Sequence, residues 1–221
     1  MGFVVAIDGP AGSGKGTVTK IVGEKLGLVY IDTGAMFRCV ALDMINKKIA
    51  IDEKEKIEDL LEKIEIDMRE NGTIFLNGEE VTKRIRENDV NGFVSPISTI
   101  KVVREKLLNI QRKIASGKAI IMEGRDIGTV VFPEADVKIY LDATPEERAN
   151  RRVKQNQEKG IETSYEEVLK NIIDRDKRDT TRDIAPLKKA EDAIYMDSSN
   201  MTIEEVSNKI IEIINRKNKR I

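Results

Sequence analysis

A glycine-rich segment near the N-terminus carries residue types that hold phosphate groups. Glycines let consecutive backbone N–H groups turn toward phosphate oxygens, and Lys15 adds a full positive charge. Gly16 stands where a hydroxyl residue usually follows the lysine, but Thr17 still provides a hydroxyl for a magnesium ion. The segment therefore predicts a loop that binds nucleotide phosphates together with Mg2+, and by itself it leaves a GTPase, a motor ATPase and a small-molecule kinase open. Its members are Gly9, Pro10, Ala11, Gly12, Ser13, Gly14, Lys15, Gly16 and Thr17.

Two further polar groups follow short apolar runs. Thr33 and Arg38 come after the run 28–31, and Glu123, Arg125 and Asp126 come after the run 119–122. Both runs suit buried strands, and ligands of open α/β folds bind at the carboxyl ends of strands. This placement favours a functional role over a packing role, and Thr33 and Arg38 are spaced to hold one phosphate group between them.

Arginines also cluster on two charged segments with helical periodicity. Guanidinium groups match phosphate oxygens in pairs, and phosphoryl transfer spreads negative charge over several oxygens. The alternative is a solvated face of surface ion pairs. The density of arginine in a chain of net charge −1 favours a phosphoryl-transfer site. The clusters are Arg148, Arg151 and Arg152, and a predicted single helix face with Arg175, Arg178, Asp179 and Arg182.

Composition removes several other kinds of chemistry. The chain has no histidine, which excludes imidazole as an acid or base. Its one cysteine, Cys39, cannot form an internal disulfide, so we expect a buried, inert thiol and a reducing compartment. The near-neutral charge gives no reason to expect nucleic acid or an acidic membrane as a partner. No apolar run is long enough to span a bilayer, so we expect a cytoplasmic protein.

The pattern of apolar residues predicts one compact α/β unit. Between residues 64 and 81 short alternating pieces, with turn signals at 71–72 and 77–78, predict a small antiparallel sheet inserted into a parallel one. Pro96 is expected to interrupt the chain just after Ser95. Buried strands are expected at 3–7, 28–31, 119–122 and 137–141, and helices at 16–27, 35–46, 52–62, 100–115, 145–159, 166–182 and 204–216.

Four segments together resemble bacterial cytidylate kinases, and the likeness runs nearly from end to end. They are 8–17, 32–38, 124–133 and 183–187, of which 124–133 is far more specific than the phosphate loop. The resemblance implies a P-loop fold of three layers with a short helical lid. It implies a core of 1–33, 106–145 and 163–221, a nucleoside-monophosphate-binding domain at 34–105, and a lid at 146–162.

The resemblance also implies roles for individual residues. Ser95, Arg104 and Asp126 would face the cytosine, Arg175 and Asp179 the ribose, and Thr33, Arg38, Arg125 and Arg182 the acceptor phosphate. The catalytic cations would be Lys15, Arg125, Arg148, Arg151, Arg152 and Arg182. Phe37 departs from the family, whose members often carry tyrosine there, which leaves a stacking role. Glu123 is either an acid near magnesium or a support for the arginines.

The expected activity is transfer of phosphate from ATP to CMP, and to dCMP, by a monomer. Asp126 can accept a hydrogen bond from the cytosine amino group. Uracil has a carbonyl at that position, which cannot donate to the carboxylate, so uracil is disfavoured. A GTPase is disfavoured because no N-K-x-D motif is present. A kinase for another acceptor and a regulatory nucleotide-binding protein remain as rivals.

Overall fold

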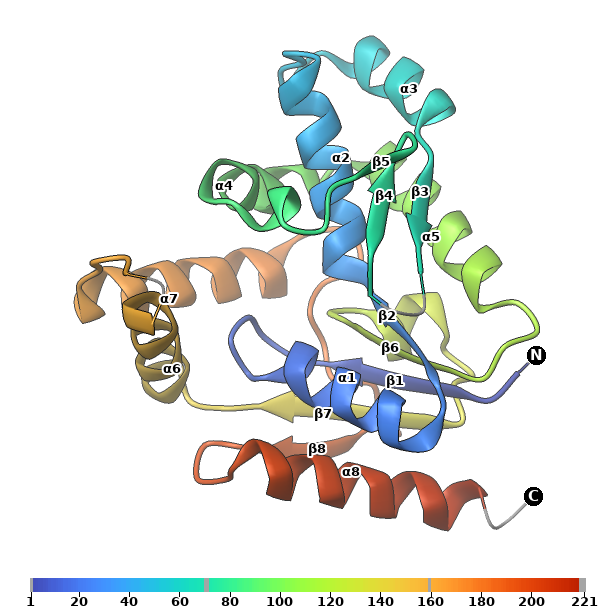
Figure 1. Ribbon diagram of the computed structural model, residues 1–221, viewed down its shortest axis with the longest axis vertical. Coiled ribbons are helices and arrows are strands. Elements are labelled where there is room, and N and C mark those ends of the chain that lie inside the picture. The colour runs from blue at the N-terminus through green and yellow to red at the C-terminus, as the bar shows by residue number, and fades with distance from the viewer. Residues whose placement is uncertain (1, 70–71, 159, 219–221) are drawn as a thin grey trace.

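A parallel sheet of five strands forms the centre of the protein (Figure 1). The computed structural model describes residues 2–69, 72–158 and 160–218, so Met1, Glu70, Asn71, Lys159 and 219–221 lie outside the described residues. Long β-branched runs make the inner strands, which are buried on both faces. The strands, in spatial order, are β2 (Val29–Asp32), β6 (Ile120–Gly124), β1 (Val4–Asp8), β7 (Val137–Asp142) and β8 (Ile194–Asp197).

Helices cover both faces of this sheet and complete the three layers that the resemblance implied. On one face, α1 (Lys15–Leu26) and α8 (Ile203–Asn218) pack over β1 and β7. On the other, α2 (Thr33–Asn46) and α5 (Lys101–Ala115) pack over β1 and β6. Because every strand is parallel, the carboxyl ends of all five meet at one edge.

The inserted segment contains the expected small antiparallel sheet, which stands beside α2 in Figure 1. One hydrophobic cluster runs from the sheet, at Ala6 and Met122, through α2 to Leu60, Ile74 and Ile97 in the insertion. The insertion therefore shares its core with the sheet. Its elements are α3 (Lys54–Lys63), β3 (Ile66–Met68), β4 (Ile74–Leu76), β5 (Glu79–Glu80), the 3-10 turn η1 (Arg84–Arg86) and α4 (Asn88–Ile97).

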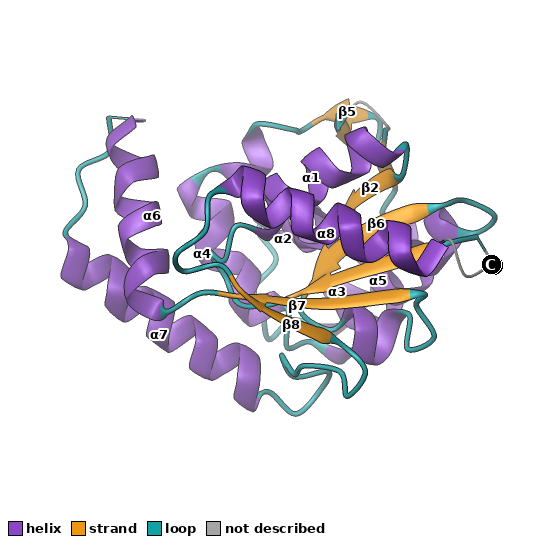
Figure 2. Ribbon diagram, turned by 90° about the horizontal axis from the view of Figure 1, so that it is seen from below, coloured by secondary structure: helices purple, strands orange, loops and turns teal. Residues whose placement is uncertain are grey.

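Helices α6 (Pro145–Glu158) and α7 (Tyr165–Thr181) project beyond the carboxyl ends of the strands (Figure 2). Ser164 caps α7 by accepting a hydrogen bond from the Glu167 N–H. The two helices bury a small apolar cluster of their own, centred on Ala149, Val168 and Ile172. Among the described residues, no helix combines the length and the apolar character needed to cross a membrane.

Three local expectations were wrong. Pro96 does not interrupt the chain, because it is the ninth residue of α4, where its missing N–H removes a single bond near the helix end. Strand β8 was not expected, since Ile194 and Tyr195 are exposed at the edge of the sheet and give no buried pattern. Helix α7 ends at Thr181, so Arg182 follows it in an extended conformation.

Candidate functional site

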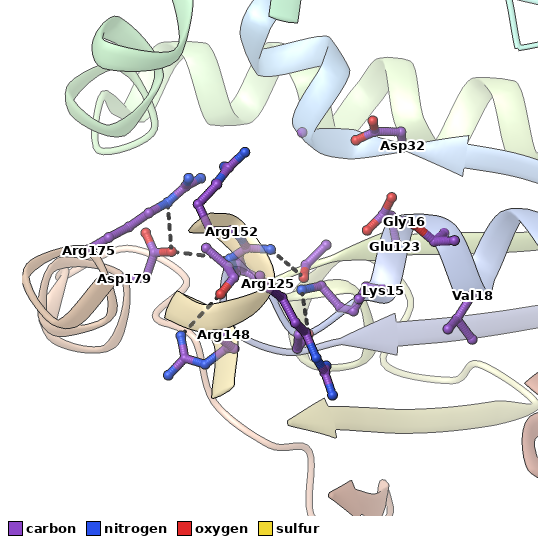
Figure 3. A pocket seen from close by; sticks show the side chains of 18 of the residues that line it. Lys15, Gly16, Val18, Asp32, Glu123, Arg125, Arg148, Arg152, Arg175 and Asp179 are labelled. Atoms are coloured by element: carbon purple, nitrogen blue, oxygen red, sulfur yellow. Dashed lines mark hydrogen bonds and ion pairs between the residues drawn. The ribbon is translucent and has the colours of Figure 1, made fainter. Parts of the chain in front are cut away.

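A cavity of about 740 Å³ lies at the carboxyl edge of the sheet. The phosphate loop lines it together with arginines from α2, α5, α7 and the end of β6. Figure 3 labels several of these side chains, among them Lys15, Arg125 and Arg175. All the acceptor-side residues named from the sequence line this cavity. From the predicted phosphate loop, Gly9 and Pro10 do not line it, and from the predicted arginine face, Arg178 is exposed and also lies outside it.

The phosphate loop wraps around the start of α1. Gly12 and Gly14 have φ angles of 81° and 88°, in the left-handed region that favours glycine. Lys15 is 4% exposed, and its Nζ donates to Pro10 O at 2.7 Å and to Ser13 Oγ at 3.3 Å. Burial first, and then the charge of Arg125, holds the pKa of Lys15 well below its usual value. A buried cation of this kind favours an anionic ligand.

Glu123 faces the start of α1 from the end of β6. A Cβ on Gly16 would lie 2.9 Å from Glu123 Oε1, so the glycine leaves room for this carboxylate. Tyr30 Oη donates to the same oxygen at 2.6 Å. Burial first, and then Asp32, raises the pKa of Glu123. The carboxylate therefore lies beside Gly16, and the charge of Lys15 acts on it, a position that suits both roles considered from the sequence.

The oxygen donors beside the loop fit a magnesium ion bound with nucleotide. Thr17 is exposed at the cavity, and Glu123 contributes a carboxylate on the same side. Across the described parts of the chain, no group of three or more His, Cys, Asp or Glu side chains is arranged to hold a metal. Magnesium in kinases is commonly held by one or two protein oxygens with substrate phosphates and water, and this donor set matches that pattern.

The acceptor side is built from basic groups held in place by neighbours. Arg38 Nε donates to Asn91 Oδ1 at 3.0 Å, and Thr33 Oγ1 donates to Glu123 O at 2.8 Å. Arg125 Nε donates to Asp179 Oδ2 at 3.1 Å. These contacts join α2, α4, β6 and α7 around one space, although the residues are far apart in sequence.

Arg175 shows that this space suits an acceptor group. Its Nε is buried and has no hydrogen-bond partner within the described residues, and Asp179 Oδ2 is 3.9 Å away. Burial first, and then Arg125, lowers the pKa of Arg175 to about 10. A buried donor without a partner is costly unless a ligand supplies the acceptor. Figure 3 shows Arg175 and Arg152 reaching toward the same region from α7 and α6.

The base side of the cavity is formed around Asp126. Arg104 Nη2 donates to Asp126 Oδ2, and Arg104 Nη1 donates to Ser98 O at 3.1 Å. Arg182 Nη2 lies 3.8 Å from Asp126 Oδ1. The ring of Phe37 lies 5.5 Å from the Arg104 guanidinium carbon, which fits the stacking role left to this residue.

Asp8 fixes the backbone that follows Asp126. Its two carboxylate oxygens accept from the N–H groups of Ile127 and Gly128 at 2.8 and 2.7 Å. These residues begin η2 (Ile127–Val131), a single π-helical turn. Burial is the largest influence and raises the pKa of Asp8 to about 6. A carboxylate at the end of β1 thus sets the position of the neighbouring loop.

The three arginines of α6 do not share one environment. Arg152 is exposed at the cavity, and it donates a hydrogen bond within its own helix, to Gln155. Arg151 donates to Glu147 and to Ser198. Arg148 is 3% exposed, and all three guanidinium nitrogens donate to internal acceptors. The expectation that Arg148 is a mobile lid cation therefore does not match its surroundings.

Sequence reasoning missed several residues that support the site. Arg86 Nη2 bonds Asp32 Oδ2 at 3.0 Å, and Asn91 Nδ2 donates to Arg86 O at 2.8 Å. Ser198, after β8, is buried and donates to Asp142 O at 2.9 Å. None of these residues belongs to a recognisable motif, and only the fold brings them to the cavity. Cys39 is buried as expected, and burial raises its thiol pKa to about 12.

Solved structures with a similar fold are distant in sequence. An uncharacterized protein from Eubacterium ventriosum is 13% identical, with a TM-score of 0.52 over 96% of this chain and 98% of its own. Shikimate kinase from Bacteroides thetaiotaomicron is 14% identical, with a TM-score of 0.50 over the same shares of the two chains. At this identity the likeness supports the fold alone.

Comparisons of sequence are more specific. The family model described as cytidylate kinase matches residues 5–216. Relatives named cytidylate kinase include one from Caldicellulosiruptor saccharolyticus, 49% identical over 95% of this chain and 94% of its own. Another, from Fusobacterium nucleatum, is 48% identical over 97% of this chain and 98% of its own. The chain therefore belongs to the cytidylate kinase family of phosphotransferases.

Proposed function

We propose that this protein transfers the γ-phosphoryl group of Mg-ATP to the phosphate of CMP, and of dCMP, to give the diphosphate. The observation that carries the proposal is the shared cavity. The phosphate loop from Ala11 to Thr17, with Lys15, lines the same cavity as the guanidinium groups of Arg38, Arg125 and Arg182. A cavity that offers both loop amides and several guanidinium groups suits in-line transfer between two bound phosphate groups.

The transfer needs no general base, because the acceptor phosphate is already anionic near neutral pH. Lys15 and the loop amides hold the donor phosphates, while Arg125 and Arg182 hold the acceptor phosphate together with Thr33 and Arg38. Thr17 and Glu123 are the residues that would hold a magnesium ion brought in with ATP, which would neutralise part of the phosphate charge. Arg151 lies beside the phosphate loop, with its Nη1 3.9 Å from the place of a Cβ on Gly14, while Arg152 reaches toward Arg175, and both would meet the charge that develops on the transferred group.

Cytosine is selected by the pair of Arg104 and Asp126, with Ser95 beside them. The Asp126 carboxylate accepts a hydrogen bond from the cytosine amino group, and Arg104 donates hydrogen bonds to the acceptor atoms of the ring. Uracil presents a carbonyl in place of the amine, which leaves the carboxylate without a donor. Arg175 and Asp179 are assigned to the ribose. Because a single chain supplies every residue of the cavity, we propose a monomer as the working unit.

A panel of acceptors tests the proposal. Release of ADP from Mg-ATP is measured with CMP, dCMP, UMP, AMP and shikimate, each over a range of concentrations. CMP and dCMP should give the highest kcat/KM. Faster turnover of AMP or shikimate would support a kinase for another acceptor, and slow ATP hydrolysis without stimulation by any acceptor would support a regulatory protein. Either result would overturn the assignment.

A further inference from the structure

Arg148 lies behind the phosphate loop and bonds three separate elements. Its Nε donates to Ala143 O at 2.8 Å, at the turn between β7 and α6. One Nη donates to Ala11 O in the phosphate loop at 3.1 Å, and the other to Asp176 Oδ2 on α7 at 2.6 Å. The guanidinium group is therefore held by two backbone carbonyls and a carboxylate from three parts of the chain.

The stem of Arg148 also supports the loop by contact. A Cβ on Gly12, whose φ is +81°, would lie 3.3 Å from Arg148 Cβ. The loop thus turns against the first carbons of this side chain, while the guanidinium group holds the carbonyl of the preceding residue, Ala11. A phosphate loop binds well when its amides are already directed inward, because little ordering is then required on binding. Arg148 supplies this constraint from the side of the loop next to α6 and α7.

Asp176 extends the connection to the acceptor side. It follows Arg175 on α7 and lies one helical turn before Asp179. Arg175 lines the cavity, and Asp179 accepts from Arg125. A single ion pair, Arg148 with Asp176, therefore connects the loop on the donor side to the helix that carries part of the acceptor side.

We propose that Arg148 is a positioning residue, which with Asp176 holds the phosphate loop in its nucleotide-binding shape. The proposal deepens the proposed function, since it assumes that the loop binds the donor nucleotide. It differs from a catalytic role in a measurable way. A catalytic cation acts on the transferred group, which ADP lacks, whereas a positioning residue changes the affinity for ADP as well as for ATP.

The experiment compares three variants by calorimetry with ADP and Mg-ATP and by steady-state kinetics. Arg148→Met keeps the stem on Gly12 and deletes the guanidinium group. This variant should lower the affinity for both ADP and Mg-ATP by roughly ten- to a hundredfold, because hydrogen bonds from a charged group are lost. The KM for CMP should stay nearly unchanged. Arg152→Met is the matched control on the same helix, and it should lower kcat with little change in ADP affinity.

Asp176→Asn is the milder variant, and it tests the positioning role of the Arg148–Asp176 pair if Arg148→Met does not fold. It keeps the side-chain size and one acceptor oxygen, so a smaller loss of ADP affinity, of about threefold to tenfold, is expected. If the folded variants of Arg148 and Asp176 bind ADP like the wild type, the proposal is wrong, and a fall in kcat alone would return Arg148 to a catalytic role. If the wild type itself does not bind ATP or turn over CMP, the proposed function has failed instead.

Discussion

Arg104 and Asp126 form a nearly buried ion pair in the wall of the cavity, with side chains 9% and 10% exposed. Neither residue is close to the other in sequence, since one lies on α5 and the other follows β6. A buried carboxylate is costly unless its oxygens are satisfied, and here Arg104 meets one oxygen while Arg182 lies near the other. The pair is therefore held in a fixed position in the cavity wall, as its proposed role in reading a base requires.

Replacing Asp126 should therefore relax the choice of base. Asp126→Asn removes the charge and places an amide donor where a uracil carbonyl would lie. We expect kcat/KM for CMP to fall by about ten- to a hundredfold and the ratio of UMP to CMP activity to rise. Kinetics with both acceptors at fixed Mg-ATP measure this, with thermal unfolding as the control for folding. An unchanged ratio would show that Asp126 does not read the base.

Lys15 should take up a proton when nucleotide binds. Its pKa is lowered in the unliganded site by burial and by Arg125, and a phosphate bound against it raises that pKa again. Between the two pKa values, binding consumes a proton, so affinity falls as the pH rises. Calorimetry at alkaline pH in two buffers of different ionisation enthalpy measures the uptake. Proton uptake on binding should vanish in Lys15→Met. It should persist in Lys20→Met, which replaces an exposed lysine of the same helix.

Gly9 should tolerate no side chain. Its φ is +150°, and a Cβ there would lie 2.0 Å from the backbone oxygen of Leu141 in the neighbouring strand. Gly9→Ala should lower the free energy of unfolding by about 2–4 kcal/mol. Gly92→Ala is the control, because the interior of α4 offers open space, and it should stabilise by about 0.5–1 kcal/mol. Urea unfolding measures the free energy of unfolding of both variants. Similar changes in Gly9→Ala and Gly92→Ala would contradict this account.

Asp8 should make stability depend on pH. Its pKa is raised from 3.8 to about 6 in the folded protein, so its contribution to stability is fully present below pH 3.8 and declines as the pH rises through 6. A shift of this size corresponds to about 3 kcal/mol. The difference in unfolding free energy between wild type and Asp8→Asn should change by most of this amount, about 2 kcal/mol or more, from pH 4 to 7. Asp67→Asn removes a charge at an exposed position and serves as the control. A difference between wild type and Asp8→Asn that does not change with pH would refute the prediction.

The sequence was sufficient for the inner strands and for the phosphate loop. A continuous apolar run such as 119–122 has few alternatives to a buried strand, and the polar residues that follow it must then lie at the sheet edge. Periodicity also located α5 and α8, because each has one strongly apolar side. Local pattern was enough wherever burial was uniform or periodic.

The remaining features depend on contacts that no local pattern contains. Asn91 reaches Arg38 only because α4 packs against α2, and α4 itself was hidden by Gly92 and Pro96. The arginines of α6 look equivalent in the sequence, yet Arg148 is buried and Arg152 is exposed. Residues four apart share one helix face, so it is their positions along α6 that separate them. Arg148 lies in the first turn, beside Ala11 of the phosphate loop and Asp176 of α7, and this packing is tertiary.

The apolar cluster that joins the insertion to the sheet also limits how the protein can move. Residues of α2 and α5 belong to the same apolar cluster as the strands, an arrangement that favours small sliding of packed surfaces, as in shear motion. Helices α6 and α7 carry a separate apolar cluster. We therefore propose that enclosure of substrates, and with it the exclusion of water as a competing nucleophile, depends mainly on this helical pair.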